Sequence, residues 1–165
     1  TWNKLSEVKN FQSLLVDRYS IPNIKNSITE IKKSGVFVVQ AGYEYPIDYE
    51  IDFLVVSKDE IGVIEAENLL NNELVSRILL THSNLPARLI SSEGAIEITP
   101  PDFKTVNATG AGDVTAAYIA ANGVEDIIST IKNACAAGAI LAGTGELPTL
   151  EKIAEISELV DVSPR

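Results

Sequence analysis

The residues best placed to do chemistry form the turn Thr109-Gly110-Ala111-Gly112-Asp113, which opens a helix of small residues. A glycine-rich turn that leads into a helix leaves several backbone N–H groups without partners. Together with the positive end of the helix dipole, these groups form an anion site. Asp113 places a carboxylate beside that site. An anion site next to a carboxylate suggests phosphoryl transfer to a hydroxyl, in which the amides bind the phosphate and the carboxylate takes the proton.

The same turn has a simpler interpretation, a strand-to-helix connection in which Asp113 is only a cap or a first-turn acid. Other phosphate motifs fit less well. A Walker A loop is excluded because no lysine follows the glycines, and Thr115 occupies the third glycine position of the dinucleotide fingerprint. The local pattern therefore leaves phosphate binding and a plain turn both open.

Glu60 is a second candidate, because it follows the apolar run Phe53–Val56, which is typical of a buried strand. Ser57 and Glu60 have the spacing of a helix capping box, which is the purely structural interpretation. A glutamate at the carboxyl end of a parallel strand also lies where ligands bind in open α/β sheets. There it could order water around a magnesium ion.

Two further segments have weaker signals. Thr81-His82-Ser83 follows the apolar run at 78–80, and a polar turn is its structural interpretation; we expect His82, the single histidine, to be a loop residue. The segment Asn133–Ala139 predicts a helix of very small residues, which includes Gly138. Such a helix packs closely on a sheet, and it would also leave room for a flat ligand such as a purine base.

The elements that must position these residues alternate along the chain. Apolar runs predict strands at 11–17, 36–39, 53–56 and 78–80, and isoleucines spaced by four and three predict an amphipathic helix over 23–33. A further helix is expected from Lys58 onward. A hairpin is expected over 87–98, followed by helices at about 114–121, 124–142 and 149–159. This order predicts a three-layer α/β/α fold whose sheet is mostly parallel, with an antiparallel hairpin at its edge.

The length, net charge and cysteine content of the chain narrow the possible class of protein further. The chain has 165 residues, enough for one domain, and its net charge of −10 argues against a nucleic-acid or anionic-membrane partner. No apolar run approaches a membrane span and no signal peptide is evident. The lone Cys135 cannot form an internal disulfide, so we expect a cytoplasmic protein. The chain contains no methionine, which indicates either a removed initiator or a piece of a longer chain.

Taken in order, these pieces resemble the second half of the ribokinase-like sugar and nucleoside kinases, the PfkB family. The string Thr109–Asp113 matches the core of the signature D-T-x-G-A-G-D. The hairpin with Pro100-Pro101 before it, the alanine-rich helix after it and the start of a last helix at Leu147-Pro148-Thr149 follow the same order. The resemblance covers residues from about 25 to the end.

The resemblance implies ATP and Mg²⁺ as co-substrate and cofactor, and a sugar or nucleoside as acceptor. It implies that Asp113 is the base and that the N–H groups of Gly110, Ala111 and Gly112 form the anion hole. It implies that Glu60 serves the metal. It places the nucleotide beside four residues: Thr81, Ser83, Asn133 and Gly138.

The chain also departs from the family pattern. Asn107 replaces an aspartate, Ser57 replaces the asparagine of the magnesium motif, and Ser83 stands where a glycine is usual. The family's N-terminal half, which carries the lid and most acceptor-binding residues, is not in this sequence. We therefore expect self-association or a complementary N-terminal half. A nucleotide- or phosphate-binding module without catalysis is the alternative function.

Overall fold

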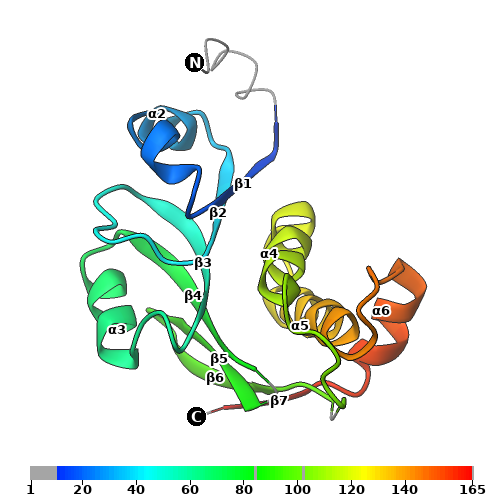
Figure 1. Cartoon of the computed structure of the whole chain (residues 1–165). Coiled ribbons are helices and arrows are strands. Elements are labelled where there is room, and N and C mark those ends of the chain that lie inside the picture. Colours follow the sequence, from blue (N-terminus) through cyan, green and yellow to red (C-terminus); the bar gives the residue numbers. More distant parts are fainter. Residues whose placement is uncertain (1–10, 84, 102, 165) are drawn as a thin grey trace.

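A computed structural model describes residues 11–83, 85–101 and 103–164, which form one seven-stranded sheet whose spatial order follows the chain from β1 to β7. The strands are β1 Ser13–Asp17, β2 Phe37–Ala41, β3 Ile51–Ser57, β4 Val75–His82, β5 Leu85–Ser91, β6 Gly94–Thr99 and β7 Asp161–Pro164. The helices are α2 Ile21–Lys33, α3 Val63–Asn71, α4 Ala111–Asn122, α5 Ile127–Thr144 and α6 Leu150–Ser157. Figure 1 shows α2 and α3 on one side of the sheet and α4, α5 and α6 on the other. The predicted three-layer α/β/α fold is confirmed.

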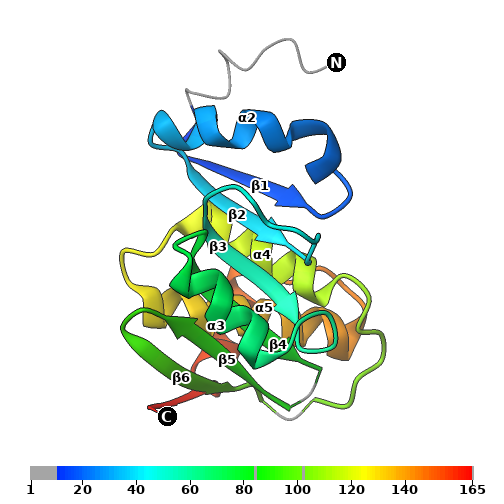
Figure 2. The ribbon, with the colours of Figure 1, turned by 90° about the vertical axis from the view of Figure 1, so that its left-hand side faces the viewer.

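Strands β1 to β4 are parallel neighbours, and α2 and α3 cover the face of the sheet that Figure 2 turns toward the viewer. The predicted amphipathic helix is α2, which buries Ile24, Ile28 and Ile31 on this face. In the continuous apolar strand β2, Val38 and Val39 point to opposite faces and both are fully buried. Burial on both faces explains why the middle of β2 and of β3 is a continuous apolar run.

The antiparallel part is larger than the hairpin that the sequence predicts. Strands β5 and β6 form this hairpin, and β7 then pairs antiparallel with β6, so that the hairpin is not the edge of the sheet. The segment that forms β7 has only four residues and ends in Pro164, which gives a weak strand signal. One other boundary differs: the helix expected from Lys58 begins at Val63.

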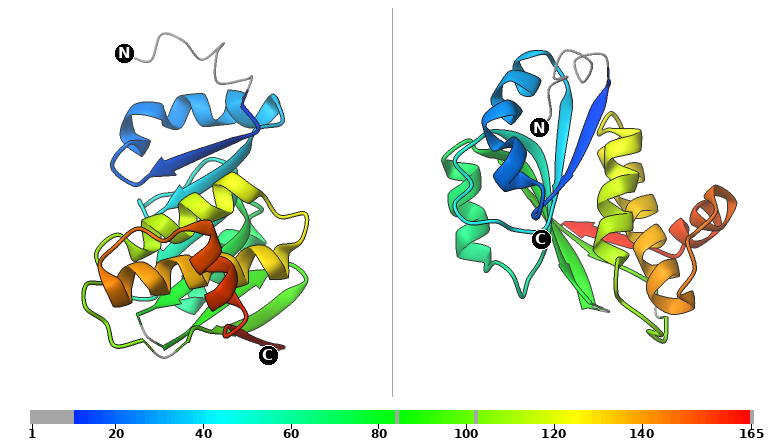
Figure 3. Two further views of the ribbon diagram at one scale, coloured as in Figure 1. Left: turned by 90° about the vertical axis from the view of Figure 1, so that its right-hand side faces the viewer. Right: turned by 45° about the horizontal axis from the view of Figure 1, so that its top comes forward.

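Helices α4 and α5 cover the other face of the sheet, and α6 packs against α5 (Figure 3). Small side chains allow this close packing, because Ala116 of α4 and Ala134 and Ala137 of α5 are fully buried. By length and composition alone, α5 would be long and apolar enough to cross a membrane. In the structure α5 packs between α4 and α6. Its length and apolar composition are therefore only weak evidence for a membrane span.

Candidate active site

The parallel strands point their carboxyl ends at one cavity of about 670 Å³. Residues at the ends of all four parallel strands line it: Asp17, Ala41, Val55, Val56, Ser57, Thr81 and His82. The turn before α4 and part of α5 complete the wall. Ligands bind at this end of the strands in open α/β sheets, so the fold places the candidate residues where a ligand site is expected.

The glycine-rich turn is held in place by the end of α5. The N–H groups of Val106 and Asn107 both donate to the carbonyl of Ala142, at 2.8 and 3.0 Å. The side chain of Asn107 accepts a hydrogen bond from the N–H of Thr109 at 3.0 Å. Gly110 then adopts φ +82°, in the left-handed region that favours glycine. These contacts fix the direction in which the first turn of α4 faces the cavity.

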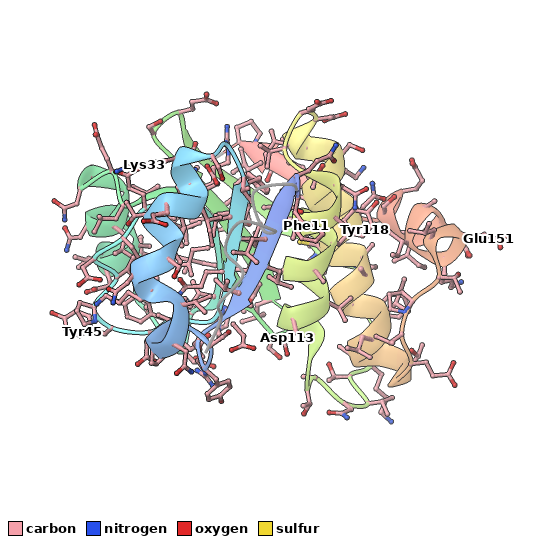
Figure 4. All side chains as sticks on the ribbon, turned by 90° about the horizontal axis from the view of Figure 1, so that it is seen from above. Phe11, Lys33, Tyr45, Asp113, Tyr118 and Glu151 are labelled. Carbon is pink, nitrogen blue, oxygen red and sulfur yellow. The ribbon has the colours of Figure 1, made fainter. Side chains whose placement is uncertain are left out.

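Two of the three predicted anion-hole amides are available to a ligand. The N–H of Ala111 donates to the carbonyl of Ala108 at 3.2 Å. Within the described residues, the N–H groups of Gly110 and Gly112 have no protein acceptor. Asp113 is exposed and lines the cavity in the first turn of α4. Figure 4 shows it on the side of α4 that faces the strands. Free donors and a carboxylate therefore share one end of the cavity.

Gly138 lines the cavity and also sets the distance between α4 and α5. A Cβ atom at this position would lie 2.4 Å from Oγ1 of Thr115 and 3.0 Å from the carbonyl oxygen of Ala111. Thr115 is buried and donates from Oγ1 to this same carbonyl at 2.9 Å. Only a residue without a side chain lets α5 approach the first turn of α4 so closely. Gly138 therefore positions the anion site as well as bordering it.

Both oxygens of Glu60 have protein partners. Oε1 forms an ion pair with the guanidinium of Arg18, and Oε2 accepts a hydrogen bond from the N–H of Ser57 at 3.0 Å. Oγ of Ser57 accepts from the N–H of Asp59 at 3.2 Å. One of the two contacts of the capping-box interpretation thus forms, from the N–H of Ser57 to Glu60, whereas the Ser57 hydroxyl bonds Asp59 and not the N–H of Glu60. These contacts close a turn that precedes the helix by several residues.

This arrangement does not fit a magnesium site built from the protein alone. No group of three or more acidic, histidine or cysteine side chains in the described residues is arranged to hold a metal ion. Glu60, the residue expected to serve the metal, is instead bonded to Arg18 and Ser57.

The other predicted nucleotide residues differ in their positions. Thr81 lines the cavity and donates from Oγ1 to the carbonyl of Val56 at 3.3 Å. Ser83 also lines the cavity, with φ +48°, in the region where glycine is usual. Asn133 is not among the described residues that line the cavity, and its Nδ2 lies 3.5 Å from Oγ of Ser129 on the same helix. The geometry brings Thr81, Ser83 and Gly138 together and leaves Asn133 outside.

The sequence did not lead us to expect site residues at the end of β1. Asp17, Arg18 and Tyr19 all line the cavity. The carboxylate of Asp17 accepts hydrogen bonds from Ser20 and from the N–H of Tyr19, and the bond from the Ser20 backbone is the main cause of the lowered pKa of this carboxyl. The polar end of the predicted strand at 11–17 was the available signal. His82, expected as a loop residue, ends β4 and also lines the cavity.

The chain belongs to the pfkB family of carbohydrate kinases, whose sequence model matches residues 37–149. This match covers β2 to the start of the last helix and includes the turn with Gly110, Gly112 and Asp113. No curated protein matches the chain significantly.

Solved structures share the fold. Ribokinase from Arabidopsis thaliana, complexed with ribose and ATP, has a TM-score of 0.78 at 19% identity over 96% of this chain and 59% of its own. Phosphofructokinase-2 from Escherichia coli, in complex with substrates and products, has a TM-score of 0.74 at 15% identity over 94% of this chain and 60% of its own. The chain thus spans about 60% of the length of these structures.

Proposed function

We propose that this chain is the phosphate-donor part of a carbohydrate kinase that moves the γ-phosphoryl group of ATP to a hydroxyl of a sugar or nucleoside. One observation carries the proposal: the free N–H groups of Gly110 and Gly112 and the carboxylate of Asp113 share one end of the cavity. The family of the chain supports the reaction class. The fold that it shares with a ribokinase complexed with ribose and ATP supports the donor.

In this mechanism Asp113 accepts the proton of the acceptor hydroxyl. The hydroxyl oxygen attacks the γ-phosphorus, a new P–O bond forms, and the bond to the β-phosphate oxygen breaks, so that ADP leaves. The amides of Gly110 and Gly112 stabilise negative charge on the transferred group. ATP would arrive as its magnesium complex, and no step requires a metal held by this chain.

The cavity beyond the phosphate end suits a nucleotide. Thr81 and Ser83 lie on one wall, and Gly138, Ala139 and Ala142 of α5 provide small side chains on the other. A cavity of about 670 Å³ falls within the range of small-molecule sites. We propose that the base and ribose lie here, with the phosphates directed toward the start of α4.

A partner for the edge of the sheet belongs to the same proposal. Within the described residues β1 pairs only with β2, so its outer edge has unused hydrogen-bonding groups. We propose that a further part of the protein, or a second copy, covers this edge and completes the acceptor site. A concentration-independent monomer of the 165-residue chain in sedimentation velocity would contradict coverage by a second copy and leave a further part of the protein as the occupant.

A nucleotide- or phosphate-binding module without catalysis is the second candidate. Two observations favour it: Glu60 has protein partners on both oxygens, and Ser83 places a side chain where the backbone adopts a glycine-like conformation. Both features lie on the side of the cavity formed by the strand ends, away from Asp113 at the start of α4. Binding of ATP without turnover would support this candidate.

For a kinase with this fold, we propose a cytoplasmic location.

The test is transfer of labelled phosphate from [γ-³²P]ATP to a panel of sugars and nucleosides by the intact protein. Asp113→Asn should lower turnover by about 10²–10⁴-fold with nucleotide affinity nearly unchanged, because the amide cannot take the proton. Asp126→Asn is the matched control, since Asp126 caps α5 and lies outside the cavity. Equal turnover of Asp113→Asn and the parent would reject the assignment of the base.

A further inference from the structure

Arg18 is fixed at the cavity by the ends of two strands. It follows β1 directly, and its N–H donates to the carbonyl of Ala41, the last residue of β2, at 3.0 Å. The next residue, Gly42, has φ +77°. A Cβ atom there would lie 3.1 Å from Cδ of Arg18 and 3.5 Å from Oε1 of Glu60. The absence of a side chain at Gly42 therefore leaves room for the Arg18 stem to reach Glu60.

The guanidinium of Arg18 is held on two sides. One nitrogen pairs with Oε1 of Glu60, and the other donates to the hydroxyl of Tyr19 at 3.0 Å. The central carbon lies 5.0 Å from the centroid of the Tyr19 ring. The side chain is still 39% exposed and lines the cavity. An arginine carries five N–H donors, so these two bonds leave donors for a ligand.

The charges around the cavity make this one cation important. Four carboxylates line it, those of Asp17, Asp59, Glu60 and Asp113. Among the described lining residues Arg18 is the single arginine or lysine. A polyphosphate in such a site needs a positive partner, and the planar donor fork of arginine matches phosphate oxygens.

We propose that Arg18 binds phosphate oxygens of the ligand, so that this site holds a polyphosphate without a protein-bound metal. The ion pair with Glu60 positions the guanidinium, and for this reason Glu60 is a positioning residue and not a metal ligand. The inference rests on the proposed function, because it takes the cavity as a nucleotide site. In this inference, the positive charge at the strand end of the cavity comes from the side chain of Arg18.

The experiment is isothermal titration of the intact protein with inorganic tripolyphosphate, and with ATP, in EDTA and again in excess Mg²⁺. We expect the parent to bind both ligands in EDTA and Arg18→Gln to bind them at least about tenfold more weakly. Lys25→Gln is the matched control, since Lys25 pairs with Asp48 outside the cavity, and its affinity should equal that of the parent.

Glu60→Gln separates a ligand contact from a structural ion pair. It removes a negative charge from the cavity, and the amide oxygen of Gln can still accept the hydrogen bond from Arg18 that Oε1 of Glu60 accepts. The guanidinium therefore stays in position, and binding in EDTA should be kept or tightened. If the ion pair only supported the fold, Glu60→Gln and Arg18→Gln would lose affinity alike, and that result would overturn the inference. Thermal unfolding of each variant identifies any that fails to fold.

The remaining outcomes separate this inference from the proposed function. A parent that binds ATP only with Mg²⁺, or an Arg18→Gln variant that binds tripolyphosphate in EDTA as tightly as the parent, overturns the role of Arg18 and leaves the kinase proposal standing. A parent that binds no ATP in either buffer overturns the proposed function and, with it, the inference.

Discussion

The two ends of the cavity solve the same problem, the binding of an anion, in different ways. At the start of α4 the donors are backbone N–H groups of Gly110 and Gly112, whose direction is set by the turn and by the packing of α5. At the carboxyl ends of β1 and β3 the donor is a side chain, Arg18, held by Glu60. The first end depends on close packing and left-handed backbone, and the second depends on one ion pair. Substitutions at the first end should therefore act through helix packing and backbone conformation, whereas substitutions of Arg18 or Glu60 at the second end should act through charge.

The largest expected effect is at Gly138, which brings α5 against the backbone-donor end. Gly138→Ala would place Cβ 2.4 Å from Oγ1 of Thr115 and 3.0 Å from the carbonyl oxygen of Ala111, which is backbone and cannot move freely. We expect a loss of about 1–3 kcal/mol in the free energy of unfolding. Denaturant unfolding measures this loss. Displacement of the first turn of α4 should also weaken phosphate binding, which titration with tripolyphosphate measures.

Gly62→Ala is the control for this substitution. Its Cβ atom would meet nothing within 4 Å, so the cost should stay below about 1 kcal/mol, with no effect on phosphate binding. If Gly138→Ala and Gly62→Ala prove equally mild, the tight contact between α4 and α5 does not position the anion site.

A smaller effect is expected at Ser83, on the nucleotide wall of the strand end. Ser83→Gly relieves a left-handed backbone, φ +48°, and should stabilise the fold by up to about 1 kcal/mol. It also removes a side chain from the cavity and should raise ATP affinity several-fold. Glu73→Gly is the matched control, because Glu73 has φ +59° but lies outside the cavity.

For this pair, thermal unfolding and calorimetry give separate readouts. Both variants should gain stability, whereas Ser83→Gly alone should bind ATP more tightly. Unchanged ATP affinity in Ser83→Gly would mean that this side chain does not obstruct the nucleotide.

Much of the fold could be predicted because its signals are local. The isoleucine spacing of α2, the two-sided apolar strands β2 and β3, and the hairpin β5–β6 each follow from periodicity. The strand β7 and the start of α3 at Val63 could not be predicted. The strand β7 depends on long-range pairing of four residues with β6, which no local pattern reveals. The start of α3 was misplaced because the Ser57–Glu60 contacts close a turn that has the sequence pattern of a helix start.

The candidate site was predictable on one side only. The turn before α4 is contiguous in sequence, so Gly110, Gly112 and Asp113 could be recognised together. The ion pair between Arg18 and Glu60 joins residues 42 positions apart, and no local pattern connects them. The use of the Ala111 N–H within the turn, and the position of Asn133 outside the cavity, likewise depend on three-dimensional geometry.

The central claim, that free amides at the start of α4 receive the transferred phosphate, can be tested directly by ¹H–¹⁵N NMR of the intact protein with ADP and beryllium fluoride as a γ-phosphate mimic. The N–H signals of Gly110 and Gly112 should move downfield and exchange more slowly with solvent, whereas that of Ala111, already bonded to Ala108, should change less. If ADP with beryllium fluoride binds while the signals of Gly110 and Gly112 stay unchanged, the account is contradicted.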